Sequence, residues 1–242
     1  MDNGSQTVAF LGLGNMGGPM AANLVGAGHR VRGFDPVEAA QDAAREAGVT
    51  VCDSPVEAVK GASVVVTMLP NGALVTSTYE TVLPEAEKGA LFVDSSTISV
   101  DDARAVHAMA VEAGMLQVDA PVSGGVKGAA AGTLAFMVGG EDEAFAAAEP
   151  VLEPMAGKVI HCGGPGAGQA AKVCNNMVLA VHQIAIGEAF VLAERLGLEH
   201  QALHDVITGA TGNSWALHTN CPVPGPVPTS PANNDRDRKS VV

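Results

Sequence analysis

The chain has 242 residues, of which 47% are hydrophobic and 16% charged, and its formal net charge at pH 7 is −13. This composition excludes an intrinsically disordered chain and is sufficient for a sizeable buried core. The negative charge argues against nucleic acid or an anionic membrane as a partner. A small anionic ligand would have to be held by backbone N–H groups and a few well-placed cations.

The cysteines and the first residues bear on metal binding and on location. Cys52, Cys162, Cys174 and Cys221 are far apart, with no CxxC and no paired Cys/His spacing, so we expect reduced thiols and no metal site. The opening residues MDNGSQTVAFLG lack a cationic segment and a long apolar core, so no signal peptide is expected. The expected location is the cytoplasm.

Strand and helix patterns alternate over residues 1–164. TVAFLG (7–12) is typical of a buried strand, residues 15–27 of a helix, and VRGFD (31–35) of a second strand. Further strands are predicted within 62–70, 89–97, 114–125, 133–140 and 157–164, with a helix over 141–155 before the last of them. This alternation predicts an α/β domain, a Rossmann-type doubly wound parallel sheet with helices on both faces.

After residue 165 only helices are predicted. Residues 166–197 contain no proline and predict one helix of roughly 30 residues, about 45 Å long. Its longest uncharged stretch, Val173–Gly187, has 15 residues, fewer than the ~20 that a bilayer requires. We therefore expect a helix buried on most faces, between domains or subunits, and no membrane partner. A short helix at 199–209 completes an all-α domain over 165–220, and residues 221–242 are expected to form an extended Pro-rich and charged surface tail.

A glycine-rich turn follows the first strand and opens the first helix. It consists of Gly12, Leu13, Gly14, Asn15, Met16 and Gly17, the GxGxxG pattern of a dinucleotide-binding loop. Asp35 ends the second strand, 18 residues after Gly17, where a carboxylate can accept hydrogen bonds from a ribose hydroxyl. Because no arginine follows Asp35 to hold a 2′-phosphate, the pattern favours NAD over NADP. The alternative is a glycine turn that binds nothing.

Other cofactor neighbours are expected at the carboxyl ends of the next strands, the edge where such sheets bind ligands. These candidates are Leu69, Pro70, Leu74 and Thr97. Apolar and hydroxyl residues also follow strands that bind no ligand, so the structural alternative stays open for each of them.

The segment DAPVSGGVKGAAAGT (119–133) offers a site for an anion. Ser123, Gly124 and Gly125 follow a strand and supply a hydroxyl and unhindered backbone N–H groups suited to a carboxylate. Lys127 is interpreted as a solvated side chain, although it could add a cation to the same site.

Lys172 and Asn176 lie four residues apart on the long apolar helix, so both side chains project from one face. Burial would lower the pKa of the lysine, and a neutral amine beside a nicotinamide can take a hydroxyl proton during oxidation. An amide one turn away could bind the same oxygen. The alternative is a lysine that extends to water from the helix end.

GLGNMG, DAPVSGG and the pattern GxxGxGxxxKxxxN (Gly163 to Asn176) occur in this order and together resemble the β-hydroxyacid dehydrogenase family. Within that family, the segment WALHTNCPVPGPVPTSPANN, with NNM and GEA on the long helix, is most similar to members that oxidise 3-hydroxyisobutyrate. The resemblance implies an NAD-dependent oxidoreductase of valine catabolism with Lys172 as acid/base. It also implies that Asn176 assists at the hydroxyl and that Ser123, Gly124 and Gly125 bind the carboxylate.

Two other functions remain open within these motifs. One is reduction of tartronate or succinate semialdehyde, and the other is NAD binding without catalysis.

The resemblance extends to about Asn234, beyond which family members continue with further helices that carry a Lys-Asp pair. Here DRDRKSVV (235–242) follows instead. We expect a helical domain with an exposed apolar face that a second copy covers, giving a homodimer or homotetramer with impaired catalysis. A monomer in size-exclusion chromatography, or full turnover, would contradict this expectation.

Overall fold

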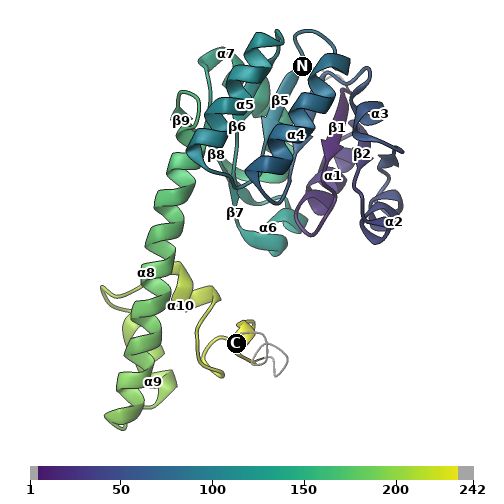
Figure 1. Cartoon of the computed structure of the whole chain (residues 1–242). Helices are drawn as coiled ribbons and strands as arrows, with labels where there is room; N and C mark the ends of the chain where they lie inside the picture. Colours follow the sequence, from purple (N-terminus) through teal and green to yellow (C-terminus); the bar gives the residue numbers. More distant parts are fainter. Residues whose placement is uncertain (1–4, 234–242) are drawn as a thin grey trace. The chain divides into compact units, whose positions relative to one another are not determined.

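A computed structural model describes residues 5–233 (Figure 1). Its contacts divide the chain into two compact units, residues up to Lys172 and residues from Val173 onward. The residues 235–242 that were expected to form a charged tail lie outside the described range.

The first unit contains one nine-stranded sheet with the order β3-β2-β1-β4-β5-β6-β8-β7, and β9 pairs with β8. The strands are β1 (Thr7–Leu11), β2 (Arg30–Phe34), β3 (Thr50–Val51), β4 (Val64–Thr67), β5 (Leu91–Asp94), β6 (Leu116–Asp119), β7 (Val122–Ser123), β8 (Leu134–Gly139) and β9 (Ala156–Gly163). Pairing is parallel from β3 to β6 and between β8 and β9, and antiparallel where β8 meets β6 and β7. The predicted doubly wound parallel sheet is confirmed, except that β8 runs antiparallel to β6 and β7.

Helices cover both faces of this sheet. They are α1 (Gly17–Gly26), α2 (Glu38–Glu46), α3 (Pro55–Val59), α4 (Gly72–Val82), α5 (Val100–Glu112), α6 (Gly125–Ala131) and α7 (Asp142–Leu152), with 3₁₀ turns η1 (Leu83–Glu85) and η2 (Glu153–Met155). One core cluster holds side chains from α1, α2, α6 and α7, and the other holds side chains from α3, α4 and α5. Figure 1 shows α4 and α5 side by side on their face.

The central strands are apolar on both sides because both faces are covered. All four residues of β4, VVVT, and all four of β5, LFVD, are buried. Such continuous runs of β-branched and aromatic residues are typical of buried parallel strands. The polar groups therefore gather in the turns that follow the carboxyl ends of these strands, at one edge of the sheet.

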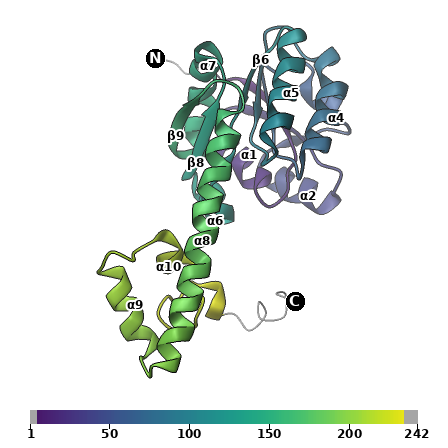
Figure 2. The ribbon, with the colours of Figure 1, turned by 60° about the vertical axis from the view of Figure 1, so that its left-hand side comes forward.

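The second unit is helical. The long helix α8 (Ala167–Arg195) begins in the first unit, and α9 (His200–Thr208), α10 (Trp215–Thr219) and the 3₁₀ turn η3 (Pro231–Asn233) follow it. Figure 2 shows α9 and α10 beside the C-terminal part of α8. Ile186 and Phe190 of α8 form a small core there with Ala216 and Leu217 of α10.

Residues 221–233 differ from the extended surface segment that the sequence predicted. Cys221, Val227 and Ser230 are buried, and Cys221 and Val227 belong to the core of the second unit. The Ser230 hydroxyl donates to the Cys221 carbonyl at 2.6 Å, closing a series of turns. The prediction was wrong because prolines exclude helix and strand but do not prevent turns that return apolar side chains to a core.

The expectation that α8 is buried on most faces is also wrong for the single chain. Met177, Val181 and Ile184 are about 60% exposed, and Leu192 is 56% exposed. By length and composition α8 could cross a membrane, a property that it shares with long helices of soluble proteins. Its middle therefore presents an apolar face.

Candidate active site

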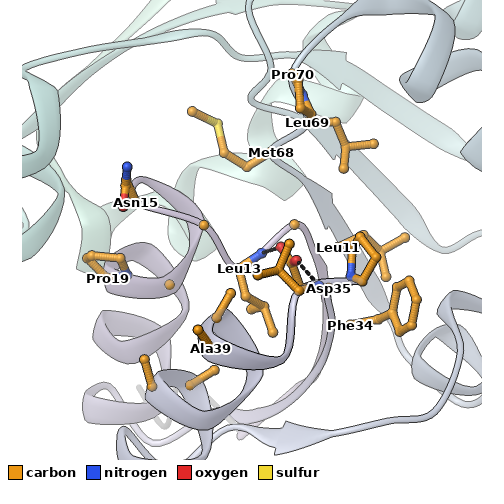
Figure 3. Close-up of a pocket in the computed structure, with 18 of the residues that line it drawn as sticks. Leu11, Leu13, Asn15, Pro19, Phe34, Asp35, Ala39, Met68, Leu69 and Pro70 are labelled. Carbon is orange, nitrogen blue, oxygen red and sulfur yellow. Dashed lines mark hydrogen bonds between the residues drawn. The ribbon is translucent and has the colours of Figure 1, made fainter.

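A cavity of about 980 Å³ opens at the carboxyl ends of β1, β2 and β4 (Figure 3). Its lining includes eight of the residues predicted to contact a cofactor: Gly12, Leu13, Gly14, Asn15, Asp35, Leu69, Pro70 and Leu74. Met16, Gly17 and Thr97 do not line it. The cavity is also lined by residues that were not predicted from the sequence: Val37, Thr78, Val126 and the alanines of α2.

The glycine loop passes close to its neighbours where a side chain would not fit. Gly12 has φ +97°, and a Cβ there would collide with the Met68 carbonyl oxygen. A Cβ on Gly17 would collide with the Gly12 carbonyl, so this glycine lets α1 start directly against the loop. A Cβ on Gly14 would meet nothing within 4 Å, because Gly14 faces the open cavity.

Asp35 fixes the loop from the end of β2. Its carboxylate accepts hydrogen bonds from the backbone N–H groups of Leu13 at 2.8 Å and Val37 at 2.9 Å, and Figure 3 shows Leu13 and Asp35 together at the cavity. Each carboxylate oxygen has a second lone pair available for a ribose hydroxyl. Among the described residues that line the cavity there is no Arg or Lys to bind a 2′-phosphate.

These features fit a dinucleotide with an unphosphorylated ribose. Open backbone at Gly14 leaves room for a pyrophosphate at the start of α1, and Asp35 is placed for the ribose. The loop and Asp35 would therefore hold NAD.

A buried carboxylate supports the loop that follows β5. Asp94 Oδ1 accepts hydrogen bonds from the Thr67 hydroxyl at 2.8 Å and from the Ser96 N–H at 3.2 Å. The Ser96 hydroxyl in turn accepts from the N–H of Leu69, which lines the cavity, at 2.9 Å. Burial raises the pKa of Asp94 to about 6, although hydrogen bonds from Ser96 and Thr67 oppose the rise.

Replacing Asp94 with Asn should flatten part of the dependence of stability on pH. Because the folded pKa, about 6, lies above the ordinary 3.8, the stability linked to Asp94 is full below pH 3.8 and is lost as pH rises through about 6. The wild type should lose about 3 kcal/mol of unfolding free energy relative to Asp94→Asn between these limits. Urea unfolding of both proteins at pH 4 and pH 7 measures this difference. An equal change in unfolding free energy between the two pH values in both proteins would contradict it.

Lys172 lies against the anion segment in the first unit. Its Nζ donates to the Val122 carbonyl at 2.7 Å, directly before Ser123. Gly124 and Gly125, with φ of +140° and +63°, turn the chain from β7 into α6, and both are exposed. Burial lowers the pKa of Lys172. A short amine-to-backbone contact therefore holds the lysine beside exposed backbone N–H groups.

The other two polar candidates are exposed. Lys127 lies on α6 and makes no ion pair within the described residues. Asn176 belongs to the second unit, one helical turn beyond Lys172 on α8, and its side chain accepts a hydrogen bond from Asn175 at 3.4 Å. Over residues 5–233, no group of three or more His, Cys, Asp or Glu side chains could hold a metal ion.

A doubly wound sheet with a glycine loop and its acidic partner defines an NAD-binding protein. Two family models match the chain, the NAD-binding domain of 6-phosphogluconate dehydrogenase over residues 7–164 and the NAD-binding domain of NADP-dependent 3-hydroxyisobutyrate dehydrogenase over residues 166–229. The chain belongs to the 3-hydroxyisobutyrate dehydrogenase family of NAD-dependent oxidoreductases.

Relatives agree with this assignment over most of the chain. The probable 3-hydroxyisobutyrate dehydrogenase of Mycobacterium tuberculosis is 72% identical over 229 residues, which is 95% of this chain and 78% of the relative. The NAD-dependent L-serine dehydrogenase of Pseudomonas aeruginosa is 45% identical, over 94% of this chain and 78% of that protein. The structure of the M. tuberculosis 3-hydroxyisobutyrate dehydrogenase with L-serine matches with a TM-score of 0.91 and 71% identity, covering 96% of this chain and 80% of that one.

Proposed function

We propose that this chain oxidises 3-hydroxyisobutyrate to methylmalonate semialdehyde, the reaction of valine catabolism, with Lys172 as the general base. One observation carries the proposal. The segment 122–126 supplies the carbonyl that binds the Lys172 amine at 2.7 Å, and it also supplies Val126 to the wall of the cofactor cavity. Five consecutive residues therefore connect the carbonyl that binds the Lys172 amine to the wall of the cofactor cavity, and this supports the proposed role of the lysine.

The glycine loop and Asp35 would hold NAD, whose nicotinamide would supply the acceptor for the hydride of the alcohol carbon. The neutral amine of Lys172 takes the hydroxyl proton, so that the alcohol becomes an aldehyde and the lysine becomes an ammonium. Ser123, Gly124 and Gly125 bind the substrate carboxylate through the hydroxyl and backbone N–H groups. Asn176 assists at the hydroxyl oxygen. Because burial lowers the pKa of Lys172, the neutral amine is more abundant near neutral pH than for a solvated lysine.

L-serine is the second candidate substrate, since one relative is named a serine dehydrogenase and the similar M. tuberculosis structure includes L-serine. Serine shares the carboxylate and the 3-hydroxyl group with 3-hydroxyisobutyrate and carries an ammonium where the latter has a methyl group.

The test is a panel of rates with NAD and NADP. It compares oxidation of 3-hydroxyisobutyrate and L-serine with reduction of tartronate semialdehyde and succinate semialdehyde. We expect the highest kcat/KM with 3-hydroxyisobutyrate and NAD. Succinate semialdehyde should react slowest, because its carbonyl is one methylene further from the carboxylate. A higher kcat/KM with L-serine would reassign the substrate, and thermal stabilisation by NAD without turnover of any substrate would indicate a non-catalytic protein.

We also propose a homodimer or homotetramer formed through the helical unit, in the cytoplasm. Met177, Val181 and Ile184 form part of an exposed apolar face on α8, and a second copy would remove that face from water.

A further inference from the structure

The first turn of α8 is held by a buried carboxylate. Asp119 ends β6 and is 1% exposed. Its Oδ1 accepts a hydrogen bond from the Gly166 N–H at 2.7 Å, and its Oδ2 accepts from the Gln169 N–H at 2.8 Å. These N–H groups stand at the helix start, where no helical carbonyl can pair with them. A carboxylate there also interacts favourably with the helix dipole.

Gln169 ties the same turn to a second loop. It is fully buried, its Nε2 donates to the Ser96 carbonyl at 2.7 Å, and its Oε1 accepts from the Ile98 N–H at 3.3 Å. The Ser96 hydroxyl accepts from the N–H of Leu69, which lines the cofactor cavity, at 2.9 Å. A continuous series of hydrogen bonds therefore joins the cavity wall to the start of α8.

Lys172 stands one turn beyond Gln169 on this helix, and its side chain is bound to the Val122 carbonyl. Close packing supports the same geometry, because a Cβ on Gly168 would collide with the carbonyl oxygen of Met137 and crowd that of Asp119. A shift of the first turn by about 1 Å would carry the Lys172 amine out of its contact with Val122 and away from the exposed backbone of Gly124. Misplacement of this size costs about 10²-fold in rate when a reacting group depends on it.

We propose that Asp119 and Gln169 are positioning residues for Lys172, which fix the first turn of α8 to the cofactor-side loop and thereby set the place of the catalytic amine. This inference rests on the proposed role of Lys172. Both residues are buried and neither lines the cofactor cavity, so each acts through the helix.

Two neutral replacements of similar volume test the pair. In Asp119→Asn, the amide group must direct an N–H at one of the two backbone N–H groups, so one hydrogen bond is lost. In Gln169→Met, both side-chain bonds to the 96–98 loop are lost without a change in charge. The matched control is Ser54→Ala, which removes the hydrogen bond from the Glu57 N–H at the start of α3; Ser54 lies outside α8 and is not among the residues that line the cavity.

Three properties of the full chain are measured in each variant: kcat and KM with the hydroxyacid, the dissociation constant of NAD, and the pKa of Lys172. The last comes from competitive acetylation at a series of pH values, read by mass spectrometry. We expect kcat to fall about 10–100-fold in both variants, with NAD affinity within about twofold of the wild type. The pKa of Lys172 should rise toward that of a solvated lysine as water reaches the amine. Loss of the Asp119 charge alone would lower it, so the direction of the shift separates position from electrostatics.

Ser54→Ala should change stability without changing kcat or the pKa of Lys172. The proposal is overturned if a folded Asp119→Asn or Gln169→Met chain keeps both values. If Asp119→Asn does not fold, Gln169→Met decides, and loss of the fold in both variants would reduce the pair to a stabilising role. A wild-type chain without turnover would refute the proposed function, whereas the acetylation measurement would still decide whether Asp119 and Gln169 position the lysine.

Discussion

Replacing Lys172 with alanine is expected to lower kcat for hydroxyacid oxidation by about 10²–10⁴-fold, the range for loss of a general base. The amine lies 2.7 Å from the Val122 carbonyl, and no other lysine is hydrogen-bonded to the 122–125 segment among the described residues. The cavity that would hold NAD is lined by other residues, so the dissociation constant of NAD should stay within about twofold. Steady-state rates with NAD fluorescence titration measure both quantities.

The matched control is Lys127→Ala. Lys127 is exposed on α6, five residues beyond Val122, so its loss removes the same charge from the same neighbourhood without removing the proposed base. It should keep kcat. Undiminished turnover in Lys172→Ala, or an equal loss in Lys127→Ala, would refute the assigned role.

The dependence of the wild-type rate on pH gives the same residue a second signature. Burial lowers the pKa of Lys172, and only the neutral amine accepts a proton. The rate of oxidation should therefore rise with pH and level off below the ordinary lysine pKa of about 10.4, while the rate of reduction should fall over the same range. This rise of the oxidation rate with pH should be absent in Lys172→Ala.

The parts of the site that are continuous in sequence were predictable. The loop from Gly12 to Gly17 and the acid at Asp35 follow from one strand–turn–helix–strand pattern. The glycines allow the backbone to turn and to approach its neighbours closely, and the carboxylate can bind a ribose hydroxyl. Lys172 was proposed from the sequence for a similar reason, since a cation is costly in an apolar helix unless it has a partner. Its partner, the Val122 carbonyl, could not be predicted from the sequence, because every residue has a backbone carbonyl.

Other features depend on contacts between distant segments. Val126 reaches the cavity only because residues 125–131 form a short helix, which a run of glycine and alanine does not indicate strongly. Asp119 was interpreted only as part of the anion motif, although its carboxylate binds N–H groups 47 and 50 residues away. The burial of Cys221 and Val227 likewise depends on the surface that α8 and α10 offer them.

Replacing Gly12 with alanine should destabilise the first unit by about 3 kcal/mol and weaken NAD binding at least about tenfold. The reason is twofold: φ at Gly12 is +97°, and a Cβ there would collide with the backbone carbonyl of Met68 and lie 3.1 Å from Leu69 Cδ2. Backbone cannot yield as a side chain can, so the loop must move away from β4 and distort the cavity. Thermal unfolding with and without NAD measures both effects.

Gly28→Ala separates backbone strain from this close approach. Gly28 has nearly the same φ, +91°, but a Cβ there would meet nothing within 4 Å, and Gly28 does not line the cavity. It should lose only about 1–2 kcal/mol, the cost of the left-handed conformation, and keep its affinity for NAD. Gly14→Ala completes the comparison, since its Cβ would project into open space at the cavity and should weaken NAD binding with little loss of stability. If Gly12→Ala and Gly28→Ala behaved alike, contact between the loop and β4 would not be what shapes the cofactor site.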